Sequence, residues 1–214
     1  MNLARMVDCL DADLCDHIVN TSWEYQKAKV LISGKRFPSE SRSNFVAALT
    51  GGLEKVVRNQ ILQALLNWSK QIKSDYPSEI VQCLYLPGIT PCFETWCEGV
   101  TILKYEQGQE YKWHTDQTEE HDCDTSSRRI SVVVYLNDDF KGGETEMIDR
   151  KYKPQKGKAL VFPSNWTYPH RACPVEEGTK YALVAWFHSG KKSDSEKKAK
   201  ERIRHKHCLL DVGY

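Results

Sequence analysis

The sequence predicts an α+β fold in which a double-stranded β-helix, or jelly roll, is buttressed by N-terminal helices. Its 214 residues are enough for one domain with a sizeable buried core. The strongest helical periodicity lies before about residue 84. From about residue 85 the pattern changes to short runs of β-branched and aromatic residues separated by turn residues. Helices followed by many short strands are typical of an α+β domain built on a double-layered sheet.

Two helices are predicted in the N-terminal part of the chain. Asp11 can cap a short helix whose apolar face consists of Leu14, Ile18 and Val19. The clearest helix runs from about residue 53 to residue 72 and is stopped by Asp75-Tyr76-Pro77. Its apolar stripe, wide enough to pack on a sheet, consists of Leu53, Val57, Ile61, Leu65, Trp68 and Ile72. The charged stretch from Gly34 to Asn44 is predicted to be a loop.

The second part of the chain is predicted to form six strands. They cover residues 100–105, 111–114, 130–136, 145–148, 157–162 and 181–187. We therefore expect three segments. Residues 1–84 form an N-terminal helical support region of the same domain, residues 85–190 form the jelly-roll core, and residues 191–214 form a basic tail.

The composition restricts the expected cellular location and the expected binding partners. The formal net charge of +1 gives no global reason to invoke a nucleic acid or a membrane. The N-terminus lacks the apolar run of a signal peptide, so a cytoplasmic location is expected. We expect the eight cysteines to be reduced, mostly buried thiols, with a disulfide framework or a zinc knuckle as the alternatives. The basic tail is interpreted as a solvated helix or tail, with contact to a nucleic acid or an acidic partner as the alternative.

A His-x-Asp pair, His114 and Asp116, ends the second predicted strand. Residues two apart on a strand point to the same face, so both side chains could reach one metal ion. His170, just before the last predicted strand, is the best placed third ligand. Two histidines and one carboxylate suit Fe(II) and leave coordination positions open, whereas a structural zinc site would be closed and preferably sulfur-rich.

Lys180 begins the last predicted strand, ten residues after His170. If its ammonium is buried, it needs an anionic partner, because an unpaired buried charge is very costly. A dicarboxylate co-substrate would supply that partner while its keto-acid end chelated the iron. The alternative places Lys180 at the exposed edge of the strand.

Several motifs in register resemble the prolyl 4-hydroxylase-type 2-oxoglutarate/Fe(II) dioxygenases over about residues 85 to 188. The first is Leu103-Lys-Tyr105-Glu-Gln-Gly108-Gln-Glu-Tyr111-Lys-Trp-His114-Thr-Asp116. The others are Tyr135-Leu-Asn-Asp, Gly142-Gly-Glu-Thr145, Lys156-Gly-Lys-Ala-Leu-Val-Phe162, Pro169-His170 and Lys180-Tyr-Ala-Leu-Val-Ala-Trp186-Phe. Motifs that occur together in the family's order are far more specific than any one of them.

The resemblance implies a role for each matching residue. His114, Asp116 and His170 would be the catalytic iron ligands, and Lys180 and Tyr105 would bind the distal carboxylate of 2-oxoglutarate. Two further residues would line the co-substrate pocket or the active-site wall, namely Thr145 and Trp186. The positions nearest the substrate would be Arg129 and His188. For these two residues and for Trp186, a purely structural role is the alternative. The register of Arg129 depends on the preceding loop, residues 117–128, which differs from the family in length. This loop is interpreted as solvated, and the alternative is a second metal site made of His121, Asp122, Cys123 and Asp124.

The resemblance also implies an activity and its cofactors. The protein would hydroxylate a C–H bond, most simply at position 4 of prolyl residues in a peptide or protein, and release succinate and CO2. Fe(II), 2-oxoglutarate and O2 would be required, with ascorbate as a further candidate. One alternative is the same chemistry on a free amino acid, another side chain or an alkylated base, although base demethylases usually hold the co-substrate with arginine. The other is a jelly-roll binding protein that has lost catalysis. Collagen in a secretory compartment is not the expected substrate, and the oligomeric state stays open.

Overall fold

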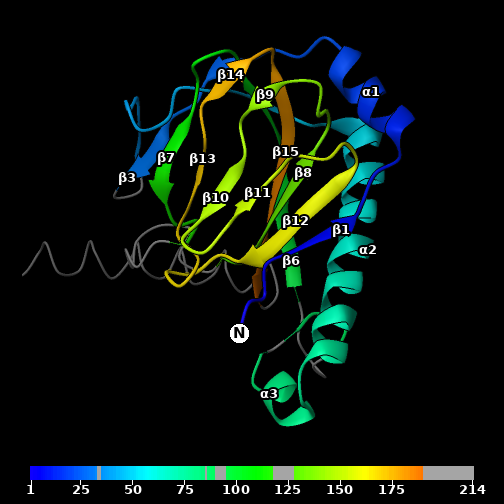
Figure 1. The fold of residues 1–214 in the computed structure, drawn as a ribbon. Coiled ribbons are helices and arrows are strands. Elements are labelled where there is room, and N and C mark those ends of the chain that lie inside the picture. Colours follow the sequence, from blue (N-terminus) through cyan, green and yellow to red (C-terminus); the bar gives the residue numbers. More distant parts are fainter. Residues whose placement is uncertain (33–34, 85, 90–94, 118–127, 190–214) are drawn as a thin grey trace, which may run out of the picture.

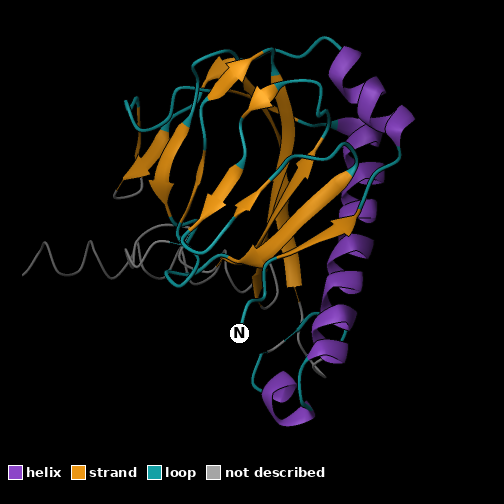
Figure 2. Cartoon of the chain, viewed as in Figure 1, coloured by secondary structure: helices purple, strands orange, loops and turns teal. Residues whose placement is uncertain are grey.

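Two antiparallel sheets face each other, and helices cover the outer face of the larger sheet (Figure 1; Figure 2). The computed structural model describes residues 1–32, 35–84, 86–89, 95–117 and 128–189. The predicted jelly roll with helical support is confirmed. Most of the 117–128 loop and the whole basic tail lie outside the described residues.

The major sheet has seven strands. They are β1 (Arg5–Asp8), β2 (Gln26–Lys27), β5 (Phe45–Ala48), β6 (Thr95–Tyr105), β8 (Arg128–Tyr135), β12 (Lys158–Pro163) and β15 (Lys180–Ser189). Their order across the sheet is β1–β12–β8–β15–β6–β5–β2, and each neighbouring pair is antiparallel.

The minor sheet has four strands in the order β11–β10–β13–β7. They are β7 (Tyr111–His114), β10 (Thr145–Met147), β11 (Lys151–Tyr152) and β13 (His170–Ala172). Two short pairs complete the described strands. They are β3 (Val30–Ile32) with β4 (Lys35–Phe37), and β9 (Lys141–Gly142) with β14 (Val175–Glu177).

Three helices are described: α1 (Ala12–Asn20), α2 (Gly51–Asp75) and α3 (Ser78–Gln82). The Asp11 side chain accepts a hydrogen bond from the Leu14 amide at 2.7 Å, as predicted for the cap of α1. The long helix α2 lies along the major sheet (Figure 1) because its apolar stripe from Val57 to Ile72 is buried there. The indole N–H of Trp68 donates to the Leu3 carbonyl at 2.7 Å and ties α2 to the segment that leads into β1.

Strand β15 shows how the major sheet serves two purposes. Leu183, Ala185 and Phe187 belong to the core beneath the helices. The alternate residues face the space between the sheets and line a pocket: Lys180, Ala182, Val184 and Trp186. The period of two along a strand therefore separates the structural face from the pocket face.

Residues 1–84 also contain strands that local sequence patterns did not predict. β1, β2 and β5 extend the major sheet at both edges, and β4 lies inside the stretch predicted to be a loop. These strands are only two to four residues long, too short to show a period. Pairing with distant strands stabilises them, as in β1, whose Asp8 lies opposite Lys158.

Among the described helices, none is long and apolar enough to cross a membrane.

Candidate metal centre

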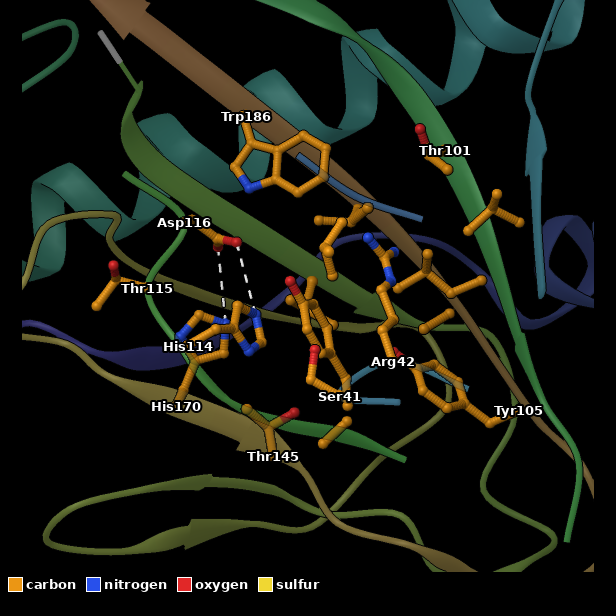
Figure 3. Close-up of a pocket in the computed structure, with 18 of the residues that line it drawn as sticks. Ser41, Arg42, Thr101, Tyr105, His114, Thr115, Asp116, Thr145, His170 and Trp186 are labelled. Atoms are coloured by element: carbon orange, nitrogen blue, oxygen red, sulfur yellow. Dashed lines mark ion pairs between the residues drawn. The ribbon is translucent and has the colours of Figure 1, made fainter. Parts of the chain in front are cut away.

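His114, Asp116 and His170 each place one ligand atom within 4.8 Å of the others (Figure 3). His114 ends β7, Asp116 follows two residues later, and His170 begins the neighbouring strand β13. Asp116 lies between the two imidazoles, with Oδ1 3.8 Å from His114 Nε2 and Oδ2 3.7 Å from His170 Nε2. The predicted triad is thus brought together, and its donor set is the one used for Fe(II) with open coordination positions.

A β-bulge in β7 controls which side chains face the pocket. His170 pairs with His114 and Ala172 pairs with Tyr111, so three steps along β7 match two along β13. Tyr111 and His114 consequently both line the pocket, and their rings stack with centroids 3.6 Å apart. The two residues between them, Lys112 and Trp113, are exposed, and Trp113 also lines the cavity. Regular alternation would have put Tyr111 and His114 on opposite faces.

Hydrogen bonds fix the tautomer of both imidazoles. His114 Nδ1 lies 2.8 Å from the Lys112 carbonyl oxygen, and His170 Nδ1 lies 3.2 Å from that of Tyr168. A carbonyl oxygen can only accept, so each Nδ1 carries the proton and each Nε2 keeps a lone pair for a metal.

The carboxylate of Asp116 is also held in place. The Ser131 hydroxyl donates to Asp116 Oδ2 at 2.6 Å, and Ser131 in turn lies 2.8 Å from the Ser164 hydroxyl. All three side chains are buried.

The electrostatics favour the protonation states that a metal requires. Burial lowers the pKa of His114, and the neighbouring His170 lowers it further. Burial alone would raise the pKa of Asp116, but the positive charges that His170 and His114 can carry hold it below its usual value. At neutral pH His114 is therefore neutral and Asp116 ionised, which is the state of metal ligands.

The triad opens into a cavity of about 590 Å³ between the two sheets. Lys180 lines the same cavity and is only 2% exposed, so the strand-edge alternative is wrong. Its Nζ donates to the Gly143 carbonyl at 2.6 Å, and no described carboxylate lies within ion-pair distance. Burial lowers the pKa of Lys180 to about 8. A buried ammonium without a carboxylate partner, in the same cavity as three metal ligands, calls for an anionic ligand.

The other predicted ligand-binding residues are placed as follows. Tyr105, Thr145 and Trp186 line the cavity, and Thr145 accepts a hydrogen bond from the buried Tyr135 hydroxyl at 2.8 Å. His188 does not line the cavity but lies behind its wall, with Nε2 2.8 Å from Glu98 and its ring stacked on Trp96.

The predicted register of Arg129 is corrected by the structure. Phe187 pairs with Ile130 and His188 pairs with Arg128, so Arg129 is the extra residue of a bulge in β8. Arg128 lines the cavity instead, with its guanidinium carbon 3.7 Å from the centre of the Trp186 ring. The length of the preceding loop left this one-residue shift undetermined in the sequence.

Glu98 and Arg42 are charged cavity residues that lie in none of the predicted motifs. A third bulge, at Gly99 with φ +124°, shifts the alternation of β6 so that Glu98 lines the cavity. Arg128 donates to both Glu98 oxygens, at 2.6 and 2.9 Å. Burial would raise the pKa of Glu98, but the hydrogen bonds from His188 and Arg128 lower it overall. Arg42 enters the cavity from the segment before β5, where its backbone bridges to Tyr111.

Comparisons with known proteins agree with this geometry. Residues 100–188 match the family described as the 2OG-Fe(II) oxygenase superfamily. The "Putative prolyl 4-hydroxylase" of Acanthamoeba polyphaga mimivirus is 30% identical, over 49% of this chain and 54% of that protein. Prolyl 4-hydroxylase 2 of Arabidopsis thaliana is 31% identical, over 47% of each chain. The chain thus spans about half the length of these curated relatives.

Solved structures show the same fold. The viral collagen prolyl hydroxylase of Paramecium Bursaria Chlorella virus-1, in its 2OG complex, superposes with a TM-score of 0.59 at 22% identity, covering 88% of this chain and 97% of that one. A Trichoplax adhaerens prolyl hydroxylase in complex with a hypoxia inducible factor peptide fragment superposes with a TM-score of 0.58 at 16% identity, covering 94% and 87%. At these identities the matches establish the fold alone, and the chemistry is inferred from the geometry of the site.

Proposed function

This chain belongs, through residues 100–188, to the 2OG-Fe(II) oxygenase superfamily, and from that membership we propose that it is an Fe(II)- and 2-oxoglutarate-dependent hydroxylase. Fe(II) and 2-oxoglutarate are typical of the family. One observation supports the proposal beyond family membership. The buried Lys180 ammonium lacks a carboxylate partner among the described residues and lines the same cavity as the metal triad. A dicarboxylate keto acid would satisfy both ends of that arrangement.

The residues present fit both groups. His114 and His170 would bind Fe(II) through Nε2, and Asp116 through its carboxylate. Lys180 would bind the far carboxylate of 2-oxoglutarate, next to Tyr105, whose ring centre lies 5.2 Å from the ammonium. When bound, iron and 2-oxoglutarate supply the oxidation of a C–H bond by O2, with succinate and CO2 as co-products.

The chain itself holds and shields these groups. The Ser131 hydroxyl orients the Asp116 carboxylate, and the backbone carbonyls of Lys112 and Tyr168 orient the two imidazoles. Apolar side chains on the pocket face of the major sheet exclude water; they include Leu103, Val133, Ala182 and Val184. The buried indole N–H of Trp186, in the cavity wall, has no hydrogen-bond partner among the described groups, so a bound ligand or water would satisfy it.

We further propose that the substrate is a prolyl residue in a peptide or protein, converted to 4-hydroxyproline. The names of the relatives and the peptide bound to the Trichoplax adhaerens neighbour support this choice. A free amino acid or another side chain is the second candidate.

An anaerobic titration tests the metal and co-substrate. We expect visible absorption to develop only when Fe(II) and 2-oxoglutarate are both present, because the keto acid then chelates the metal. His170→Ala should abolish it, whereas His17→Ala, which removes an exposed histidine of α1, should not. Absence of the band in the wild-type protein would refute the hydroxylase proposal.

Succinate release, measured across proline-rich peptides, free amino acids and oligonucleotides, tests the substrate. Mass spectrometry would locate the added oxygen. Stimulation by free amino acids or nucleic acid alone, with none by peptides, would overturn the prolyl assignment while leaving the hydroxylase proposal intact.

A further inference from the structure

The charged side chains of the cavity do not balance. The described residues that line it include four cationic side chains, Lys29, Arg42, Arg128 and Lys180, and two carboxylates, Glu98 and Asp116. Asp116 belongs to the metal triad, and Glu98 is held by Arg128 and His188. Lys180 would bind the co-substrate. Arg42 and Lys29 remain, and neither forms an ion pair with a described carboxylate.

Arg42 is held rigidly close to the metal centre. Its backbone bridges to Tyr111, and its neighbour Ser41 accepts a hydrogen bond from the Lys112 amide at 2.8 Å. Its guanidinium carbon lies 4.7 Å from the centre of the Tyr111 ring. Because that ring stacks on His114, a single aromatic side chain separates the guanidinium from a metal ligand. Figure 3 shows the Arg42 side chain in the cavity between Tyr105 and the triad.

The hydrogen-bonding capacity of Arg42 is not used up. Nε donates to Asn44 Oδ1 at 3.0 Å, and Tyr111 is the other described partner. A guanidinium has more N–H donors than these two groups accept, and its planar fork matches a carboxylate. Lys29 lines the same cavity and is exposed, so it adds positive charge on the solvent side.

We infer that the primary substrate carries a carboxylate that Arg42 binds beside the metal centre, with Lys29 adding longer-range attraction. This inference rests on the proposed function. The carboxylate can come from an acidic side chain near the hydroxylated residue of a peptide, or from the α-carboxylate of a free amino acid. Both sources offer the same chemistry to the guanidinium, and the experiment separates them.

The test measures binding rather than turnover. The protein is loaded with Zn(II) and 2-oxoglutarate, and fluorescence anisotropy reports the affinity of labelled prolyl peptides. Glutamate is placed in turn at each position within three residues of the proline, and each peptide is paired with its glutamine counterpart. A charge-assisted bidentate contact predicts that at least one glutamate peptide binds about ten- to a hundredfold more tightly than its counterpart. Calorimetric titration with L-proline and L-prolinamide forms the second arm.

Variants assign the effect to Arg42. Arg42→Gln should abolish the preference for the carboxylate, Arg42→Lys should keep part of it, and Lys29→Gln should weaken it about two- to threefold. Lys55→Gln is the matched control, because Lys55 is exposed on α2. All four variants should retain their affinity for metal and 2-oxoglutarate. A loss of 2-oxoglutarate affinity in Arg42→Gln would assign Arg42 to the co-substrate and overturn the inference.

The two arms lead to distinct results. A charge preference confined to peptides identifies an acidic side chain, and one confined to proline against prolinamide identifies an α-carboxylate. Equal binding of every charged and neutral pair, or a preference that survives Arg42→Gln, would overturn the inference. A wild-type protein that binds neither metal nor 2-oxoglutarate would instead refute the proposed function.

Discussion

His170 lies directly opposite His114 across the antiparallel strands β13 and β7. Opposed residues of antiparallel strands have their Cβ atoms about 4.5–5.5 Å apart, so backbone pairing already sets the spacing of the two imidazoles. The ring centroids lie 4.3 Å apart. The sheet thus preorganises two of the three ligands.

Replacing Ser131 by alanine should weaken metal binding about 10- to 100-fold. The change removes the hydroxyl that donates to Asp116 Oδ2, and the loss of such an outer hydrogen bond typically costs that much metal affinity. Competitive titration with a chromophoric chelator measures the affinity. The control is Ser69→Ala in α2, because Ser69 is equally buried but its hydroxyl has no described hydrogen-bond partner. Unchanged metal affinity in Ser131→Ala would show that the hydroxyl does not orient the carboxylate.

The affinity for 2-oxoglutarate should fall as the pH rises through about 8. Burial lowers the pKa of Lys180 to about 8 in the protein without co-substrate, and only the ammonium form attracts a carboxylate. Calorimetric titrations between about pH 7 and 9.5 would detect a decline approaching tenfold per pH unit above the pKa. In Lys180→Met the affinity should be low throughout and lack this decline. A flat profile in the wild-type protein would contradict a Lys180 contact with the co-substrate.

The same group affects stability with a definite sign. The folded pKa of Lys180 lies below the unfolded value of 10.5, so burial of the charge destabilises the fold. This destabilisation has its full size below about pH 8. Between about pH 8 and 10.5 the unfolded chain binds the additional proton, and the Lys180 contribution to the free energy of unfolding rises with pH. Denaturant unfolding of wild type and Lys180→Met would measure this contribution. The stability of the wild type relative to Lys180→Met should rise with pH over that range.

Gly143→Ala should reduce 2-oxoglutarate affinity more than metal affinity. Gly143 has φ +67°, and a Cβ there would lie 2.9 Å from Phe140 Cε2 and 3.2 Å from Lys180 Cδ. The residue also accepts the Lys180 hydrogen bond, so a shift of its backbone would displace the ammonium. Gly108→Ala is the matched control. It has a similar φ of +79° but no atom within 4 Å of its Cβ, and should lower stability without affecting either ligand. Equal effects of both variants on 2-oxoglutarate would mean that backbone strain alone is responsible.

Trp68→Ala should lower the free energy of unfolding by about 3–5 kcal/mol. Trp68 is 1% exposed, fills the space between α2 and the major sheet, and donates to the Leu3 carbonyl. Urea unfolding followed by circular dichroism measures the loss. Val56→Ala on the same helix removes a side chain that is 49% exposed and should change stability by no more than about 0.5 kcal/mol. A Trp68→Ala loss as small as that of Val56→Ala would disprove the packing role.

Local sequence patterns were sufficient for the elements with a clear period. The stripe from Val57 to Ile72 predicted α2, and the motif around His114 and Asp116 predicted the metal centre. Lys180 was recognised through its motif, although its burial could only be seen in three dimensions. The stripe of α2 lies within one element, and the metal ligands and Lys180 lie in short motifs, so all of them are visible in the linear sequence.

Features that depend on pairing between distant strands were not predictable in this way. Bulges at Gly99 and Arg129 each shift a strand by one residue and exchange which neighbour faces the pocket. For that reason the sequence does not reveal Glu98 and Arg128 as cavity residues, and it predicts Arg129 where the structure has Arg128. Arg42 joins the site through a single backbone bridge to Tyr111, which no local pattern reveals. The cytoplasmic location and the character of the basic tail stay predictions.

The position of β15 has a consequence for the order in which the protein can assemble during its synthesis. β15 is the last described strand along the chain, yet in the major sheet it lies between β8 and β6. Before the ribosome has released Lys180–Ser189, only two separate half-sheets can exist, β1–β12–β8 and β6–β5–β2. Each half then presents an unpaired inner edge, the kind of surface that recruits foreign strands. Synthesis proceeds at about 5–20 residues per second. Because β6 emerges before β8, the edge of β6 is exposed for longer than the edge of β8. A nascent chain stalled before residue 180 would therefore lack both Lys180 and a continuous major sheet. Its two unpaired edges would be open to aggregation.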